Sequence, residues 1–151
     1  MALPLSAALG QNDTMTAPVP NYVLRFFDAK LRMGYIATAR PDGHLSVVPV
    51  GVMLHDGRVR ISSPTDTFKV RNLRHDPHIA VCVPDAADPR RYLMIRGLAE
   101  LADDTDKAFL NWLARTHMGL DDYFHESPEV LRTVITIKAE RFIMAGTHGD
   151  G

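Results

Sequence analysis

The chain has 151 residues, which is the size of one ordinary domain and long enough to bury a core. Apolar residues make up 46% and charged residues 23%, with 17 Lys and Arg against 18 Asp and Glu. This is the composition of an ordinary soluble protein, and the balanced charge gives no support to a nucleic-acid-binding or membrane-associated class. The single cysteine, Cys82, excludes an intramolecular disulfide and fits a reducing cytoplasm.

The N-terminal 18 residues mix small and turn-forming residues without periodicity. They are expected to form a flexible tail, and Met15 is an alternative start to Met1. The segment lacks the cationic and long apolar regions of a signal peptide, and no stretch of the chain approaches a membrane span. Residues 19–151 are therefore predicted to form a single domain.

The first half of this domain predicts one helix and a meander of strands. Apolar residues at helical spacing, with Pro20 placed for the first turn, predict a helix over 20–31. Three β-rich runs follow within 34–63, separated by the turn signals "RPDG" and "HDG", and predict antiparallel strands. Residues 66–75 predict a short helix that stops at Asp76-Pro77, because the residue before proline leaves the helical region.

The second half predicts further strands around a second helix. The run "HIAVCV" predicts a strand that buries Cys82, and residues 92–101 alternate as a strand in which Gly97 marks a bend or bulge. Residues 104–117 predict a helix that opens with a threonine cap. The run "VITIKAERFIMAG" predicts two final strands or one long, bent strand. Six or seven strands with short turns predict a mainly β protein, a barrel or sandwich with helices as covers.

The stretch "SSPTDTFKVRNLRHDP", residues 62–77, is a candidate anion site. A strand delivers the chain to a helix start, where unpaired amides and the helix dipole attract anions. Thr65 and Thr67 could meet a phosphate there, and Lys69 could add a full charge. The alternative is that Ser63 or Thr65 only caps the helix, with Lys69, Arg71 and Arg74 on a solvated face.

Pro49 is a second peculiarity, because a proline inside the strand pattern "LSVVPVGVML" removes a ladder hydrogen bond, and Gly51 follows on the same face. A planar ring stacked against residues 48–51 would explain an unpaired strand edge with little side-chain bulk. An ordinary edge strand or a bulge explains the proline equally well.

Other chemistry finds less support. The seven histidines show no metal-ligand spacing, so no metal site is predicted. Cys82 lies within a strand rather than at a helix start, and the chain has no G-x-S-x-G, P-loop or G-x-G-x-x-G pattern, which disfavours covalent catalysis. Phe68 is the only aromatic residue in the basic run 58–74, too few for a single-strand nucleic-acid binder.

The runs "GYIATARPDGHLSVVPVGV", "RVRISSPTDTFKVRNLRHDPHIAVCV" and "RYLMIRGLAEL", in this order, resemble the split β-barrel family related to pyridoxamine 5′-phosphate oxidase. The resemblance spans residues 21–146 and is closest to the branch that depends on the deazaflavin coenzyme F420. Its most specific part is the K-x-R-N-L-x-x-D-P string from Lys69 to Pro77.

The resemblance implies a homodimer with the cofactor in a groove at the subunit interface. The anion of residues 62–77 would then be the cofactor's phosphate, and the activity would be hydride transfer to a small organic substrate, such as one with an activated double bond. The implied phosphate ligands are Ser62, Thr65, Thr67 and Lys69, with Asn72 as a support for that loop. The implied ring contacts are Val48, Pro49 and Val50.

Two departures from the oxidases bear on the cofactor and substrate. Phe68 stands where pyridoxamine phosphate oxidases place an arginine before the lysine, which weakens the case for FMN binding. The C-terminus lacks the basic motif with which these oxidases bind the substrate's phosphate, which weakens the case for their activity. The alternatives are an FMN-dependent oxidase or reductase and a non-catalytic module that binds a flavin, deazaflavin or haem. Tyr35, Tyr92 and His125 carry groups that could donate a proton, and the sequence does not choose among them, so no catalytic residue is assigned.

Overall fold

The computed structural model describes residues 19–121 and 126–146, so the predicted tail over residues 1–18 lies outside the described residues. The elements in chain order are α2 (Asn21–Phe27), β1 (Arg32–Ala39), β2 (Leu45–His55), β3 (Arg58–Pro64), α3 (Phe68–His75), β4 (His78–Pro84), β5 (Tyr92–Asp103), the 3-10 turn η1 (Thr105–Lys107), α4 (Ala108–His117) and β6 (Arg132–Ala145).

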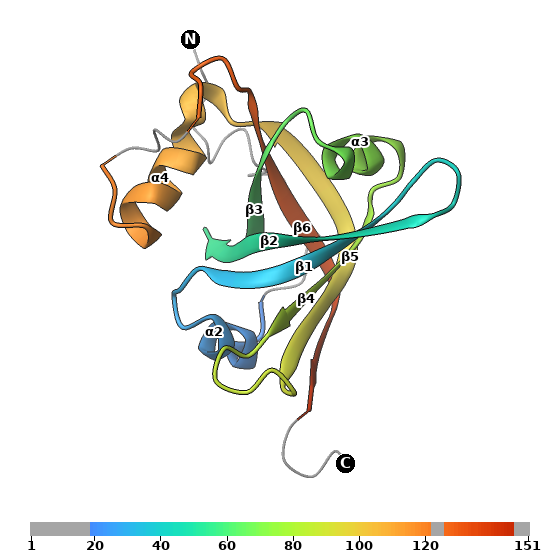
Figure 1. Ribbon diagram of the computed structural model, residues 1–151. Coiled ribbons are helices and arrows are strands. Elements are labelled where there is room, and N and C mark those ends of the chain that lie inside the picture. Colours follow the sequence, from blue (N-terminus) through green and yellow to red (C-terminus); the bar gives the residue numbers. More distant parts are fainter. Residues whose placement is uncertain (1–18, 122–125, 147–151) are drawn as a thin grey trace.

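The six strands close into a barrel in the order β1-β2-β3-β6-β5-β4, and every neighbouring pair is antiparallel (Figure 1). Consecutive strands pair where the turns are short, and β6 closes the ring by lying between β3 and β5. The prediction of a mainly β barrel with peripheral helices is confirmed.

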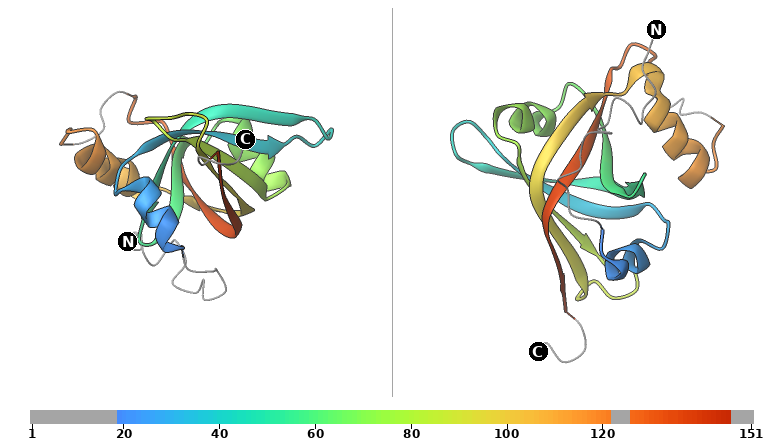
Figure 2. Two further views of the ribbon diagram at one scale, coloured as in Figure 1. Left: turned by 90° about the horizontal axis from the view of Figure 1, so that it is seen from below. Right: turned by 180° about the vertical axis from the view of Figure 1, so that it is seen from behind.

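The barrel interior is the main core, and two short helices contribute to it from opposite sides (Figures 1 and 2). Helix α2 packs Val23 and Phe27 into it, and α3 packs Val70 and Leu73. Helix α4 lies outside the barrel, where its apolar stripe forms a second cluster with strand residues. The members of this second cluster that are fully buried are Met53, Phe109, Leu110, Leu113 and Val134.

The long pair β5–β6 confirms two sequence predictions at once. The final run is one continuous strand, and its register with β5 shifts between Arg96 and Gly97. A Cβ on Gly97 would lie 2.0 Å from the carbonyl oxygen of Lys138, so only glycine allows the two backbones to approach this closely.

Three local predictions are corrected. The first helix ends at Phe27 rather than at residue 31, because Asp28 and Ala29 both take left-handed backbone angles, with φ of 51°. Helix α4 begins at Ala108, and its first amides are capped by the carboxylate of Asp104 rather than by a threonine, with Phe109 N and Leu110 N donating over 2.8 and 2.9 Å. Cys82 lies on β4 as predicted but is only half-buried.

Across the described residues, none of the helices has the length and apolar character needed to span a bilayer.

Candidate functional site

An opening between β2 and β3 is the main irregularity of the barrel. In the described chain, these two strands pair only through Met53, Leu54 and His55 of β2 with Arg60, Val59 and Arg58 of β3. The backbone edges of Leu45–Val52 and Ile61–Pro64 therefore diverge after a short ladder, and α3 follows β3 on the same side of β2 (Figure 1). We call this feature the β2–β3 opening.

Pro49 lies in the unpaired part of β2 that borders this opening. It stands opposite Tyr35 of β1, so β2 keeps its ladder on one side while the proline costs no hydrogen bond to β3. The sequence expectation of an unpaired edge around residues 48–51 is thus confirmed. Tyr35, one of the candidate proton donors, is 49% exposed beside the same edge.

The three predicted ring contacts present different surfaces to the opening. Val48 and Pro49 are exposed, whereas the side chain of Val50 is buried in the barrel core. Because neighbouring residues of a strand point to opposite faces, a ring on one face of this edge could contact the side chain of either Val48 or Pro49, and only the main chain of Val50. Gly51 comes next, and a Cβ there would lie 2.9 Å from the Cδ1 of Leu31.

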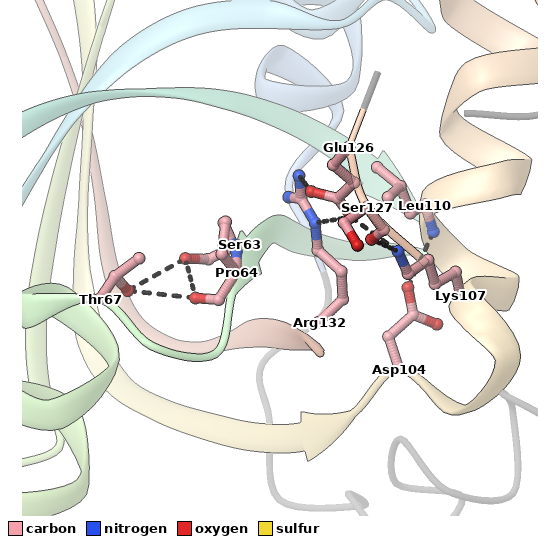
Figure 3. Close-up of polar contacts among 9 residues, drawn as sticks. All are labelled: Ser63, Pro64, Thr67, Asp104, Lys107, Leu110, Glu126, Ser127 and Arg132. Atoms are coloured by element: carbon pink, nitrogen blue, oxygen red, sulfur yellow. Dashed lines mark hydrogen bonds and ion pairs between the residues drawn. The ribbon is translucent and has the colours of Figure 1, made fainter. Parts of the chain in front are cut away.

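Hydroxyl groups fix the turn that leads from β3 into α3. Thr67 is the N-cap, since its Oγ1 accepts a hydrogen bond from Val70 N, and it also donates to the carbonyl of Pro64 (Figure 3). The hydroxyl of Ser63 lies 3.3 Å from that of Thr67. The suggestion that Ser63 or Thr65 is the cap is corrected, and the helix begins at Phe68 rather than at residue 66.

The remaining predicted phosphate ligands differ in how well they are satisfied. The hydroxyl of Thr65 lies 2.8 Å from that of Thr133 on β6, so it already has a partner. Ser62 Oγ, by contrast, is buried and has no hydrogen-bond partner among the described residues. An unsatisfied buried hydroxyl costs about 1–3 kcal/mol, which a ligand's acceptor atom would recover.

Lys69 gives the strongest indication of an anion site among these residues. It is partly buried in the first turn of α3, and no carboxylate in residues 19–121 and 126–146 forms an ion pair with it. The pKa of Lys69 lies below its ordinary value because of this burial, and the positive charge of Arg132 lowers it further. A partly desolvated cation that faces another cation at a helix start is a local environment that favours an anion.

Arg132, at the start of β6, is a site residue that the sequence reasoning missed. It lines a pocket of about 200 Å³ together with Ser62 and Gly51, and the rest of the lining is apolar. The apolar members are Leu31, Met33, Met53, Leu110, Leu113 and Met118. Nothing in the sequence marks Arg132, because it becomes a neighbour of Ser62 only through the pairing of β3 with β6.

Other predicted or considered residues lie elsewhere. Asn72 is buried, and its Nδ2 donates to Thr38 Oγ1, so its side chain fastens α3 to β1 rather than supporting the 62–67 loop. Arg71 and Arg74 are exposed, as the solvated-face interpretation expected. Tyr92 starts β5 opposite Pro84, and His125 lies outside the described residues.

Arg60 is a buried cation of a different kind. It is 1% exposed under α4, and it donates to Thr136 Oγ1 over 3.0 Å and to His55 Nδ1 over 2.6 Å. Its acceptors come from the fold itself, and it does not line the pocket of Ser62 and Arg132. In the part of the chain that the structure describes, no cluster of three or more His, Cys, Asp or Glu side chains could hold a metal ion.

Comparisons with known proteins agree with this geometry. A family model described as "Pyridoxamine 5'-phosphate oxidase" matches residues 23–145. An F420 reductase is similar in structure with a TM-score of 0.69 and 29% identity, over 83% of this chain and 98% of the other.

Two further solved structures share the fold at lower identity. General Stress Protein 26 from Bacillus anthracis has a TM-score of 0.59 and 18% identity, over 80% of this chain and 88% of its own. A heme binding protein from Mycobacterium smegmatis has a TM-score of 0.61 and 22% identity, over 83% of this chain and 53% of its own. A search of curated protein sequences gives no match.

Proposed function

The chain belongs to the pyridoxamine 5′-phosphate oxidase family, and on this premise we propose that it is an oxidoreductase that uses coenzyme F420 to reduce a small organic substrate, such as one with an activated double bond. The 29% identity to an F420 reductase over most of both chains supports F420 over other cofactors of the family. Phe68, in place of an arginine before Lys69, also disfavours FMN in this proposal.

The observation that carries the proposal is the environment of Lys69. Among the described residues this partly buried lysine has no carboxylate partner, and such a lysine destabilises the protein unless another group, such as a ligand, supplies the counter-charge. A phosphate at the start of α3 would do so, and Ser62 Oγ lies unsatisfied on the adjacent strand. In this proposal, Lys69 and Ser62 hold the phosphate, while Thr65 and Thr67 shape the turn.

We propose that the ring of the cofactor binds along the edge of β2. Its backbone is unpaired toward β3, and the exposed side chains of Val48 and Pro49 present an apolar group on each face of the strand. F420 supplies a hydride when bound, so the protein needs to orient the reactants and exclude water rather than provide a nucleophile. Tyr35, opposite Pro49, is the candidate proton donor nearest this edge in the strand register.

We propose a cytoplasmic homodimer with the cofactor groove at its interface. Apolar side chains stand exposed on one face of β1 and β2, which border the β2–β3 opening: Met33 is 64% exposed, Val47 63% and Leu45 76%. A contiguous apolar face of this kind usually marks an interaction surface. Sedimentation equilibrium checks this point, and a monomer at micromolar concentration would contradict it.

FMN is the second candidate, because the matching family model is named after a pyridoxamine phosphate oxidase. The same lysine and opening would hold its phosphate and ring. A third possibility is a module that binds a flavin, deazaflavin or haem without turnover, for which the described residues offer no separate support.

A titration of the purified protein with F420 and separately with FMN, followed by ligand fluorescence, tests the proposal. We expect preferential binding of F420 and, with reduced F420, consumption of an electron-poor acceptor. Preferential binding of FMN would move the protein to the second candidate, and F420 binding without turnover of a panel of acceptors would move it to the third.

A further inference from the structure

Arg132 and Glu126 form an ion pair beside the proposed phosphate site. Arg132 Nε donates to Glu126 Oε1 over 3.0 Å, and Nη2 donates to Oε2 over 2.7 Å, which is a bidentate contact (Figure 3). The two side chains are 10% and 13% exposed. The hydrogen bond from Arg132 holds the pKa of Glu126 below its ordinary value, so the carboxylate is ionised at neutral pH.

Glu126 also binds a second cation. Lys107 Nζ, at the end of η1, donates to Glu126 Oε1 over 3.0 Å and to the carbonyl of Ser127 over 3.3 Å. The carboxylate of Glu126 thus accepts hydrogen bonds from both Arg132 and Lys107, as Figure 3 shows. If Arg132 exchanged its partner, Glu126 would keep an ion pair with Lys107.

Arg132 in turn reaches the anion environment. It stands opposite Pro64 in the β3–β6 register, two residues from Ser62, and both Arg132 and Ser62 line the 200 Å³ pocket. Its charge acts on Lys69 strongly enough to lower the pKa of that lysine. Ser62 and Arg132 therefore line one pocket, and Lys69, in the first turn of α3, is within range of the charge of Arg132. Among the described residues, Arg132 has a carboxylate partner and Lys69 has none.

We propose that Arg132 is a third anion-binding residue of this site, and that the carboxylate of Glu126 is an internal competitor which the incoming phosphate displaces from Arg132. The inference rests on the proposed function for the identity of the ligand, since the phosphate would be that of F420. Displacement leaves no charge unpaired, because Glu126 stays with Lys107 while the phosphate gains Arg132, Lys69 and Ser62.

The competing explanation is that Glu126 only fastens segment 126–131 to the barrel through Lys107 and Arg132. The two explanations predict opposite signs for one substitution. If Glu126 competes with the ligand, its neutralisation strengthens anion binding. If Glu126 only holds Arg132 in place for structure or orientation, its neutralisation leaves binding unchanged or weakens it.

The experiment uses the full chain and three single variants: Glu126→Gln, Arg132→Gln and the control Glu129→Gln, whose carboxylate is exposed on the same segment. Dissociation constants are measured for F420 by fluorescence and for inorganic pyrophosphate by calorimetry, below the onset of unfolding of each variant. We expect Glu126→Gln to bind both probes severalfold more tightly and Arg132→Gln to bind both about tenfold more weakly, the loss of one charge-assisted contact.

The double variant Glu126→Gln with Arg132→Gln separates competition from a general charge effect. A competitor acts only through Arg132, so the double variant is expected to match Arg132→Gln within about twofold, outside simple additivity. Glu129→Gln should behave as the wild type. If Arg132→Gln does not fold, Arg132→Lys keeps the charge but loses the bidentate fork, and we expect a smaller loss of affinity and a weaker response to Glu126→Gln.

Weaker or unchanged binding in Glu126→Gln, or an Arg132 variant that binds pyrophosphate as the wild type does, would overturn the inference. Wild-type binding of pyrophosphate without F420 or FMN would overturn the proposed cofactors and leave the anion site to be judged by the same variants. Wild-type binding of neither probe would overturn both.

Discussion

Arg60 on β3 and Lys69 in the first turn of α3 are successive cations in the sequence, and their surroundings differ in the partners that they offer a positive charge. Arg60 is completely buried under α4, yet Thr136, His55 and Asp56 surround it with partners. Lys69 is less buried, yet burial and the positive charge of Arg132 both lower its pKa, and no carboxylate of the described residues forms an ion pair with it. The first environment is complete within the fold, whereas we propose that the second is completed by an anion from outside.

This difference teaches that burial of a charge does not by itself indicate function. A buried cation with a full set of acceptors stabilises packing, and its removal leaves the acceptors unpaired. A buried cation that lacks acceptors lowers stability and persists because it serves binding. Methionine is close to both side chains in length, so the free energies of unfolding of Arg60→Met and Lys69→Met measure this difference.

Arg60→Met should give the largest loss of stability. It leaves His55 Nδ1 without its donor and Thr136 without its partner under α4, and breaking a buried charged network of this kind costs about 3 kcal/mol. Urea unfolding measures the change, with the exposed Arg74→Met as the matched control. A loss below about 1 kcal/mol would mean that Arg60 is not a structural cation.

The same region should make stability depend on pH. The pKa of His55 lies below its ordinary value because burial disfavours the charged ring. The negative charge of Asp56 raises the pKa in part, and the positive charge of Arg60 lowers it by less than Asp56 raises it. As pH falls below about 6.5, the unfolded chain takes up a proton before the folded chain does, so stability decreases by at most about 1.4 kcal/mol per pH unit for this group. The loss ends once pH passes the lower folded-state pKa.

Unfolding free energies between pH 7.5 and 5 check this expectation, as about two pH units cover the window in which one shifted histidine titrates. His55→Gln should flatten the dependence. His117→Gln is the necessary comparison, because burial also lowers the pKa of His117. If the pH dependence of the unfolding free energy were the same in His55→Gln as in the wild type, a group other than His55 would cause it.

Thr67→Ala should cost about 1 kcal/mol, the usual value of a lost N-cap, and Thr67→Ser should restore most of it. The substitution also removes one of two hydrogen-bond partners of Ser63, whose hydroxyl keeps its bond to the carbonyl of Pro64. If Thr67→Ala instead lowered cofactor affinity more than stability, Thr67 would contact the phosphate, as the family resemblance implies, and not only cap α3.

Lys69→Met should have the smallest effect on the unfolding free energy, near zero or slightly stabilising. The lysine is partly desolvated and has no carboxylate partner in the part of the chain that the structure describes, so an apolar side chain of similar length suits this place at least as well. The same urea unfolding measures it. A loss comparable to that of Arg60→Met would erase the contrast between the two regions.

The sequence alone could not predict most of the difference between the surroundings of Arg60 and Lys69. Strand alternation and turn residues predict the barrel, and Pro49 and Gly97 predict an unpaired edge and a bulge, because such signals act within a few residues. Lys69 was identified through its family string. The partners of both cations, however, come from strands far away in the chain: Thr136 from β6 for Arg60, and Arg132 from the same strand for Lys69.

The misplaced boundaries have a similar cause. Three hydroxyl residues precede α3, and the sequence does not say which one caps it. In the structure, Thr67 accepts from Val70 N, while the hydroxyl of Thr65 pairs with that of Thr133 on β6. Helix α4 gains its cap from Asp104 at five and six residues' distance, beyond the usual capping pattern, because η1 intervenes.

The affinity of Lys69→Met for F420, measured by fluorescence titration beside the wild type and Arg74→Met, tests the central claim most directly. We expect Lys69→Met to lose about 1.5–3 kcal/mol of binding free energy, roughly 10- to 150-fold in affinity, with its stability retained and Arg74→Met unchanged. Binding of F420 by Lys69→Met as tight as by the wild type would contradict the account and return Lys69 to the solvated face of α3.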